Sequence, residues 1–407
     1  MEKKFAFGLK FSIFNLLIVA LLGLIMRYKI IFSFPYFNQK YLLEAHAHYA
    51  FYGWITFALY ILIAQYLKEI KPDLNLTKYR NLILGNLIVS IGMLVSFTSG
   101  GYNVWSILFS VVALILSVIY FVQIIKDTKG IQRNSKIWFT GGLFFAVFSS
   151  IGVLALSYMM LNKHIYQDIY LAAQYFYLHF QYNGFFIFSC IGLLLHSLRK
   201  IGVEITVKQN KTIFGLLFIG CLVGYGLSIL WAKLPLWFFI ILIVATLLQT
   251  WGAIKLYALI KNNHVKIKAA WTPLQRFVLF YLGIAFTAKI LLQLGSNIPA
   301  VSQFAFGFRN SVIAYLHLIL LMIISVFLVN QIITQSYFKQ NKIAFFGLKL
   351  FLLGIFLNEL VLGLMGVFSI KYVAIPYAHE SLVIISVLIF IAVLLILLNL
   401  KYTKTLK

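Results

Sequence analysis

Acidic residues are scarce in this chain: nine Asp and Glu stand against 34 Lys and Arg in 407 residues. Charged residues of both signs make up 11%, whereas a soluble domain carries about 25%. Hydrophobic residues make up 62%, and the mean hydropathy is +0.96. Apolar runs of about 20 residues recur along the whole chain, and each is long enough to cross a bilayer. The composition excludes an ordinary soluble protein and predicts a polytopic membrane protein.

Cysteine is also scarce, and β-strand patterns are missing. Cys190 and Cys221 both lie in apolar runs without metal-type spacing, so we interpret them as small buried hydrophobes. No strand alternation, low-complexity tract or convincing short repeat is present. No small-residue cleavage site follows the first apolar run, which argues against a removable signal peptide.

The hydrophobic runs predict an all-α polytopic membrane bundle of about 12 transmembrane helices, forming a single integral-membrane helical domain over residues 1–407. The expected spans are 8–28, 43–66, 80–99, 104–125, 137–162, 169–198, 213–232, 235–260, 273–296, 306–334, 344–370 and 374–400.

The basic residues predict the orientation. Of the 34, 26 lie at the termini or in the loops after even-numbered spans. Because cytoplasmic loops carry the Lys and Arg excess, both termini should be cytoplasmic, in a multi-pass protein of the inner (cytoplasmic) cell membrane. The excess would also face anionic lipid of the bilayer. It is spread over seven segments without a recognition motif, so we expect no nucleic acid partner.

Six of the eight histidines fall in the outer half of this topology. Five of them lie on four spans: His46 and His48 at the start of span two, His179 in span six, His317 in span ten and His379 in span twelve. Any one of them could be a polar residue hydrogen-bonded between helices. Together they could converge on one centre, since neutral imidazole binds heme iron, copper or zinc, and histidine pairs hold heme in helix bundles.

His46 and His48 are two residues apart, so on a helix their side chains point about 200° from each other. They cannot easily chelate one metal. We expect one of them, His48, to face His317 across a heme-sized gap. The other would serve a second site or face the headgroups.

Few other polar residues interrupt the spans. Glu359 in span eleven and Lys289 in span nine could relay protons, or could pair with each other. Glu380, next to His379, could join such a relay or be an acid favoured at a helix start. Tyr315 lies near the histidine of span ten and is a further relay candidate.

Three segments resemble subunit I of the heme-copper oxidases and nitric oxide reductases: "HAHYAFYGW" in span two, "YLHFQYNGFFIF" in span six and "NSVIAYLHLILLM" in span ten. The resemblance implies that His46 or His48 together with His317 ligates a low-spin, b-type heme. It implies that His179 is the remnant of a copper or iron site, to which we add His379 as a candidate ligand.

Two departures from that family are visible. Span seven, "TIFGLLFIGCLVGYGLSILW", lacks the family's His-His pair, and Tyr315 replaces the ligand of the catalytic heme. A complete binuclear centre is therefore not expected. "EAHAHYAFYGW" also resembles the motif of the NnrS family, which is linked to heme, copper and nitrosative stress.

These patterns leave three functional hypotheses open. The first is a heme-dependent oxidoreductase-like protein for electron transfer or respiratory or NO-related redox chemistry, with a redox partner subunit. The second is a proton- or metal-ion-coupled transporter. The third is a non-catalytic assembly or sensory protein that retains the oxidase-like fold.

Overall fold

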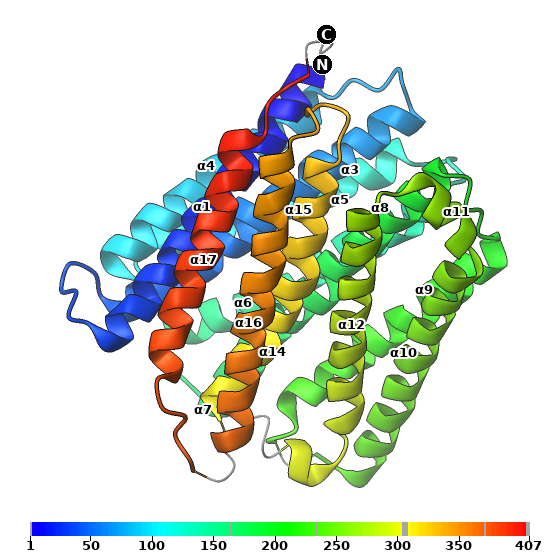
Figure 1. Ribbon diagram of the computed structural model, residues 1–407. Helices are drawn as coiled ribbons and strands as arrows, with labels where there is room; N and C mark the ends of the chain where they lie inside the picture. The colour runs from blue at the N-terminus through cyan, green and yellow to red at the C-terminus, as the bar shows by residue number, and fades with distance from the viewer. Residues whose placement is uncertain (1, 163, 233, 303–307, 370–371, 404–407) are drawn as a thin grey trace. The chain divides into compact units, whose positions relative to one another are not determined.

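The computed structural model describes residues 2–162, 164–232, 234–302, 308–369 and 372–403. Helices joined by short loops make up this part of the chain, which contains no β-strand beyond one isolated bridge between Phe338 and Tyr402 (Figure 1). Twelve helical stretches in it are long and apolar enough to cross a membrane. The prediction of an all-α membrane bundle of about twelve spans is confirmed.

The spans agree with the predicted ranges to within a few residues at most ends. They consist of α1 (Glu2–Ile31); α2 (Gln39–His48), η1 (Tyr49–Thr56) and α3 (Phe57–Ile70); α4 (Thr77–Gly100); α5 (Val104–Asp127); α6 (Asn134–Leu161); α7 (Gln167–His179), η2 (Phe180–Phe186) and α8 (Ile187–Lys200); α9 (Val207–Gly224) and η3 (Tyr225–Ile229); α10 (Leu236–Asn262); α12 (Pro273–Gly295); α14 (Arg309–His317), η4 (Leu318–Ser325) and α15 (Val326–Ile333); α16 (Lys342–Ser369); and α17 (Ala378–Asn399). A short helix that the sequence did not predict, α11 (His264–Ala270), lies between spans eight and nine.

The helices form two compact units. Unit 1 comprises Met1–Tyr120 and Ile324–Lys407, and unit 2 comprises Phe121–Ile323. The chain passes from one unit to the other within α5 and again within η4. The single domain expected from the sequence stays a prediction.

In unit 1 the two ends of the chain meet. Helix α1 packs against α17, and α17 packs against α16. The tail pairs with the loop after span ten, because Lys339 N–H donates to the Lys401 carbonyl (2.8 Å) and Thr403 N–H donates to the Tyr337 carbonyl (2.9 Å). The Lys10 ammonium lies 5.4 Å from the Tyr402 ring centre. Both termini thus lie at one end of this unit (Figure 1), as an even number of spans requires; that this end is cytoplasmic stays a prediction.

In unit 2, α6 packs closely against span six, and α10 packs against α9 and α12. Glycines on α6 make the close approach possible, as small residues do between membrane helices. A Cβ on Gly152 would lie 2.4 Å from the Ala173 carbonyl oxygen, and one on Gly142 would lie 3.0 Å from that of Phe185.

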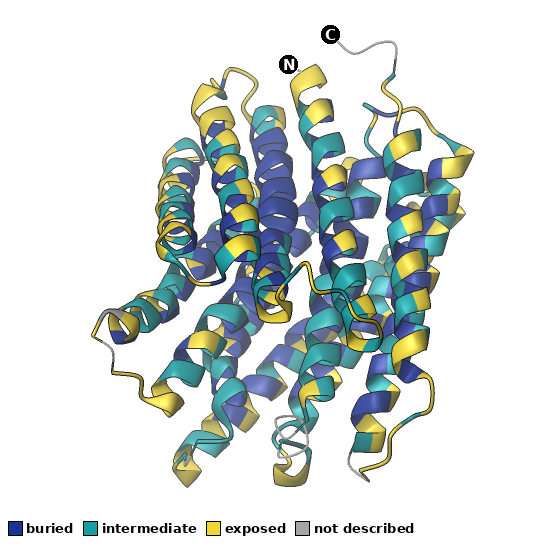
Figure 2. Ribbon diagram, turned by 90° about the vertical axis from the view of Figure 1, so that its left-hand side faces the viewer, coloured by how far each residue is buried: buried dark blue, intermediate teal, exposed yellow. Residues whose placement is uncertain are grey.

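Burial separates three spans from the other nine. The central windows of spans two and six are 94% and 89% buried, that of span ten is 56% buried, and no other reaches 45%. Exposed residues recur along most of the remaining helices (Figure 2), and many of them are apolar, among them Ile88, Val95, Val104 and Ile240. Exposed apolar faces on long helices fit a lipid bilayer as the surrounding medium. The chain is thus a multi-pass membrane protein; which membrane holds it stays a prediction.

Candidate functional sites

A repeated local structure marks the three most buried spans. In spans two, six and ten an α-helix ends at a histidine (His48, His179 and His317), and a π-helical segment of seven or eight residues begins at the next residue. π-Helical turns are rare and are found frequently at functional sites. The histidines of these spans therefore share one position in a structural repeat, although no repeat was found in the sequence.

The first two copies of this repeat also share a glycine, the fifth residue after the histidine. A Cβ on Gly53 would lie 2.6 Å from the Tyr49 ring, and one on Gly184 would lie 2.5 Å from Cβ of Phe145. Both positions are too tightly packed for any side chain. The third copy has Met322 at this place.

Asparagines from neighbouring helices stabilise the first π segment. Asn15 of α1 donates to the Gly53 carbonyl (2.5 Å) and accepts a hydrogen bond from the Tyr49 hydroxyl (2.8 Å). Asn86 of α4 donates to the Tyr52 carbonyl (2.9 Å). Because lipid offers no hydrogen bonds, backbone carbonyls at membrane depth need such protein partners. These buried amides thus hold η1 in place.

His46 and His48 point to opposite sides of span two, as their spacing predicts. His46 contacts α1, with Nδ1 3.1 Å from the Val19 carbonyl oxygen and Cε1 3.4 Å from the Cβ position of Gly23. His48 stacks on Phe97 of α4, with ring centres 4.1 Å apart and planes 21° apart. The two imidazoles contact different helices, α1 and α4. This geometry rules out that they chelate one metal ion together.

Only one of the two ring nitrogens of His48 is hydrogen-bonded to a residue that the structure describes. Its Nδ1–H donates to the Glu44 carbonyl at 2.9 Å, and no residue that the structure describes hydrogen-bonds Nε2. The Nδ1 atom of His317 likewise donates to the carbonyl four residues earlier, that of Ile313 (2.8 Å). A hydrogen bond from one nitrogen to a backbone carbonyl fixes the tautomer of metal-ligating histidines and leaves the other nitrogen as ligand. His48 and His317 thus share one feature, a hydrogen bond from Nδ1 to a carbonyl of their own helix.

His179 is arranged differently. It is 1% exposed, and its Nε2–H donates to the Cys221 carbonyl at 2.8 Å. Its Nδ1 then accepts a hydrogen bond from the Asn183 amide at 3.2 Å. Cys221 lies in the last turn of α9, where carbonyls lack partners further along the helix. Since both nitrogens of His179 are used within the protein, it does not fit the metal-ligand role implied by the family resemblance unless one of these bonds breaks.

The other predicted metal ligand, His379, is exposed at the start of α17, and Glu380 beside it is exposed too. Glu380 lies in the first turn of the helix, where the helix dipole favours an acid. In the part of the chain that the structure describes, no three His, Cys, Asp or Glu side chains converge as a metal site.

The proton-relay candidates are divided between the two units. In unit 1, Glu359 accepts a hydrogen bond from the neighbouring Asn358 amide (3.0 Å) and interacts electrostatically with Arg27 of α1. In unit 2, Tyr315 packs edge-on to Tyr182, with ring centres 6.3 Å apart, and Lys289 is 4% exposed on α12. A relay among these residues stays a prediction.

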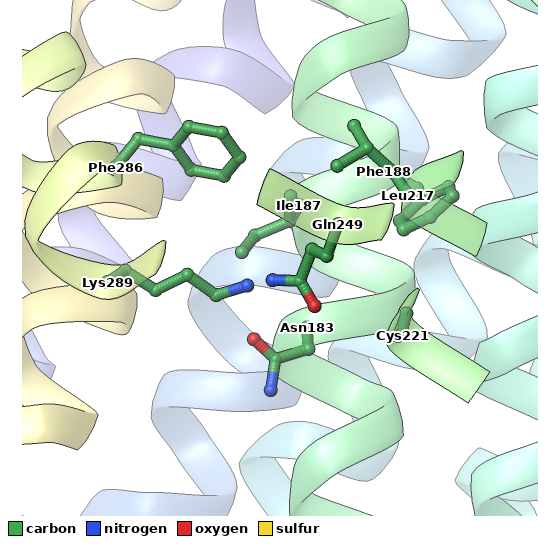
Figure 3. Close-up of a pocket in the computed structure, with 8 residues that line it drawn as sticks. All are labelled: Asn183, Ile187, Phe188, Leu217, Cys221, Gln249, Phe286 and Lys289. Atoms are coloured by element: carbon green, nitrogen blue, oxygen red, sulfur yellow. The ribbon is translucent and has the colours of Figure 1, made fainter. Parts of the chain in front are cut away.

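Sequence reasoning missed a polar cluster in the interior of unit 2. Asn183 of η2, Gln249 of α10 and Lys289 of α12 line one small cavity (Figure 3). The Gln249 amide donates to Gln293 of α12 at 2.6 Å. The available signal was that each is an isolated polar residue within an apolar span, a pattern that marks function more often than chance.

Comparison with known proteins adds no relative: neither a protein-family model nor a curated protein matches this chain. The resemblance to oxidase subunit I therefore rests on the quoted segments and on the histidines alone.

Proposed function

We propose that this protein is a heme-binding redox protein of the membrane, with His48 and His317 as the ligands of heme iron. One observation supports the proposal. Both histidines end an α-helix directly before a π segment, and both donate Nδ1–H to the carbonyl four residues earlier, at 2.9 and 2.8 Å.

The protein would contribute the orientation of the ligands. The carbonyls of Glu44 and Ile313 hold each imidazole in the tautomer whose Nε2 carries the lone pair. Stacking on Phe97 fixes the ring plane of His48. When bound, a heme with histidine ligands supplies one-electron transfer.

Electron transfer or redox sensing fits these residues better than oxygen reduction. The second metal of an oxidase needs histidines from spans six and seven, but His179 uses both nitrogens in hydrogen bonds and span seven contains no histidine. His46 faces α1 on the opposite side of span two from His48, so it would not share one heme iron with His48.

An optical spectrum of the protein purified from heme-replete cells, with heme extraction and metal analysis, tests the proposal. We expect a Soret band that is lost or strongly shifted in His48→Leu and in His317→Leu. His379→Leu, which removes an exposed histidine, is the matched control and should keep the spectrum.

If the two histidines hold one heme, the double variant should lose no more heme than either single variant, because effects within one site are not additive. A colourless wild-type protein, or unchanged spectra in both single variants, would contradict the proposal.

A further inference from the structure

The cavity in unit 2 is lined by a lysine that forms no ion pair with any residue that the structure describes. It lies among η2, α8, α9, α10 and α12, and its polar lining residues are Asn183, Gln249 and Lys289 (Figure 3). Its apolar lining includes Phe188, Leu217 and Phe286. The space inside is roughly that of one water molecule or one monatomic ion.

Lys289 belongs to the buried face of α12. It falls on the stripe Ala285, Lys289 and Gln293, which are 0%, 4% and 6% exposed. Figure 3 shows its ammonium pointing between the amides of Gln249 and Asn183. No hydrogen bond or ion pair to Lys289 exists among the described residues. The centre of the Phe286 ring lies 5.8 Å from the Lys289 Nζ atom, and Cys221 and His179 are close enough to interact with it electrostatically.

Unit 2 has no carboxylate near this ammonium. Its sequence contains three acids: Asp127 ends α5, Asp168 begins α7, and Glu204 is exposed between α8 and α9. None of them lines the cavity. An ionised side chain at membrane depth is costly unless a partner of opposite charge offsets it, and unit 2 itself provides no such partner at this cavity.

Asn183 is a second sign of an incomplete site. Its side chain is 3% exposed, and its Oδ1 atom has no hydrogen-bond partner. Its amide nitrogen is engaged by His179, which orients the free oxygen toward the cavity. An ammonium has three N–H donors. The Asn183 oxygen can accept one of them, which leaves the others for a bound ligand.

We infer that this cavity is a binding site for a small monovalent anion of about the size of chloride, with the Lys289 ammonium as its counter-charge. The lysine, together with the absence of a carboxylate from the cavity lining, sets the sign of the ligand, and the cavity size limits it to a monatomic or similarly small ion. This site is independent of the proposed heme ligands, since it uses none of their residues.

Thermal denaturation of the purified protein in an uncharged detergent tests the inference, with chloride replaced by the bulky anion gluconate at constant ionic strength. A ligand that binds only the folded state stabilises it in a saturable way. Between about 1 and 100 mM chloride we expect the midpoint temperature to rise by about 2 °C or more, and to stay constant in gluconate.

Two variants should abolish the chloride response. Lys289→Met removes the charge while keeping the chain length, and Asn183→Asp places an internal carboxylate beside the ammonium in the place of the anion. Lys255→Met is the matched control, because Lys255 on α10 already packs 4.9 Å from the Trp251 ring centre; this variant should keep the full response.

The inference is wrong if the wild-type protein melts at the same temperature in chloride and gluconate, or if Lys289→Met still responds to chloride. Should Lys289→Met fail to fold, Asn183→Asp decides: loss of the response in a folded protein supports the site, and an unchanged response overturns it. If neither variant folds, the wild-type comparison of chloride with gluconate decides alone.

Discussion

His48 in unit 1 and His179 in unit 2 occupy the same place in a structural repeat but have different partners. Each is the last residue of an α-helix before a buried π segment. His48 is half-buried, stacks on Phe97 and donates a hydrogen bond from one ring nitrogen to a carbonyl of its own helix. His179 is buried, and both of its ring nitrogens form hydrogen bonds. One of these bonds goes to the carbonyl of Cys221 in another span.

The difference shows that position in the repeat does not decide the role of the histidine. A histidine with one ring nitrogen not hydrogen-bonded to the protein can bind a cofactor through that nitrogen. A histidine whose two ring nitrogens are both hydrogen-bonded to the protein can instead link one helix to another. This contrast is why we propose His48, and not His179, as a cofactor ligand, whereas the hydrogen bonds of His179 connect helices within unit 2. Three predictions test this contrast between the units, in addition to the heme and anion experiments above.

The largest effect is expected at the shared glycine. Gly184→Ala should lower the free energy of unfolding by about 3 kcal/mol, because the new methyl group would meet Cβ and Cγ of Phe145, which cannot turn away. Gly53→Ala should cost less, about 1–2 kcal/mol, since its methyl group would meet outer ring atoms of Tyr49, which can be displaced further than a Cβ atom. Unfolding in mixed detergent micelles measures both. Equal costs would show that the two π segments are packed alike.

A smaller effect is expected from removing the histidines. His179→Leu leaves the Asn183 amide and the Cys221 carbonyl without their partner and should cost about 2 kcal/mol. His48→Leu should cost less than about 1 kcal/mol in heme-free protein, because its one hydrogen bond is to its own helix. The same unfolding assay applies. A greater loss for His48→Leu than for His179→Leu would reverse the assignment of roles.

The smallest contrast concerns the amides that surround the π segments. Asn86→Leu leaves the Tyr52 carbonyl without its side-chain donor and should cost about 1.5 kcal/mol. Gln181→Leu in η2 removes only a bond to the Ser149 hydroxyl, which also donates to the Ala146 carbonyl, and should cost at most about 0.5 kcal/mol. Similar values for both would mean that Asn86 does not support η1 specifically.

Much of the fold was predictable from the sequence because membrane spans are set by length and hydropathy. All twelve spans were found, and the opposite directions of His46 and His48 followed from their spacing alone. The π segments could not be predicted. Where every face of a helix is apolar, as in "LILLMIIS" of η4, hydrophobic periodicity carries no information about helical register.

The candidate sites were predictable only in part. Isolated histidines drew attention to His48, His179 and His317, but the partners that distinguish them lie 4, 42 and 4 residues away. The carbonyl of Cys221 is a backbone group, invisible to any motif search. Lys289 was considered as a proton carrier or a partner of Glu359, and the cavity that gives it another role is formed by helices distant in sequence.

The pairing of the tail with the loop after span ten has a consequence for how the protein is made. Unit 2 is one continuous piece of chain, so all its residues are synthesised before the second part of unit 1. The backbone hydrogen bonds of Lys401 and Thr403 to Lys339 and Tyr337 form later still. The first helices of unit 1 thus wait in the membrane for segments made after unit 2, and a chain that stops after Ile323 would contain all of unit 2 but only the first part of unit 1.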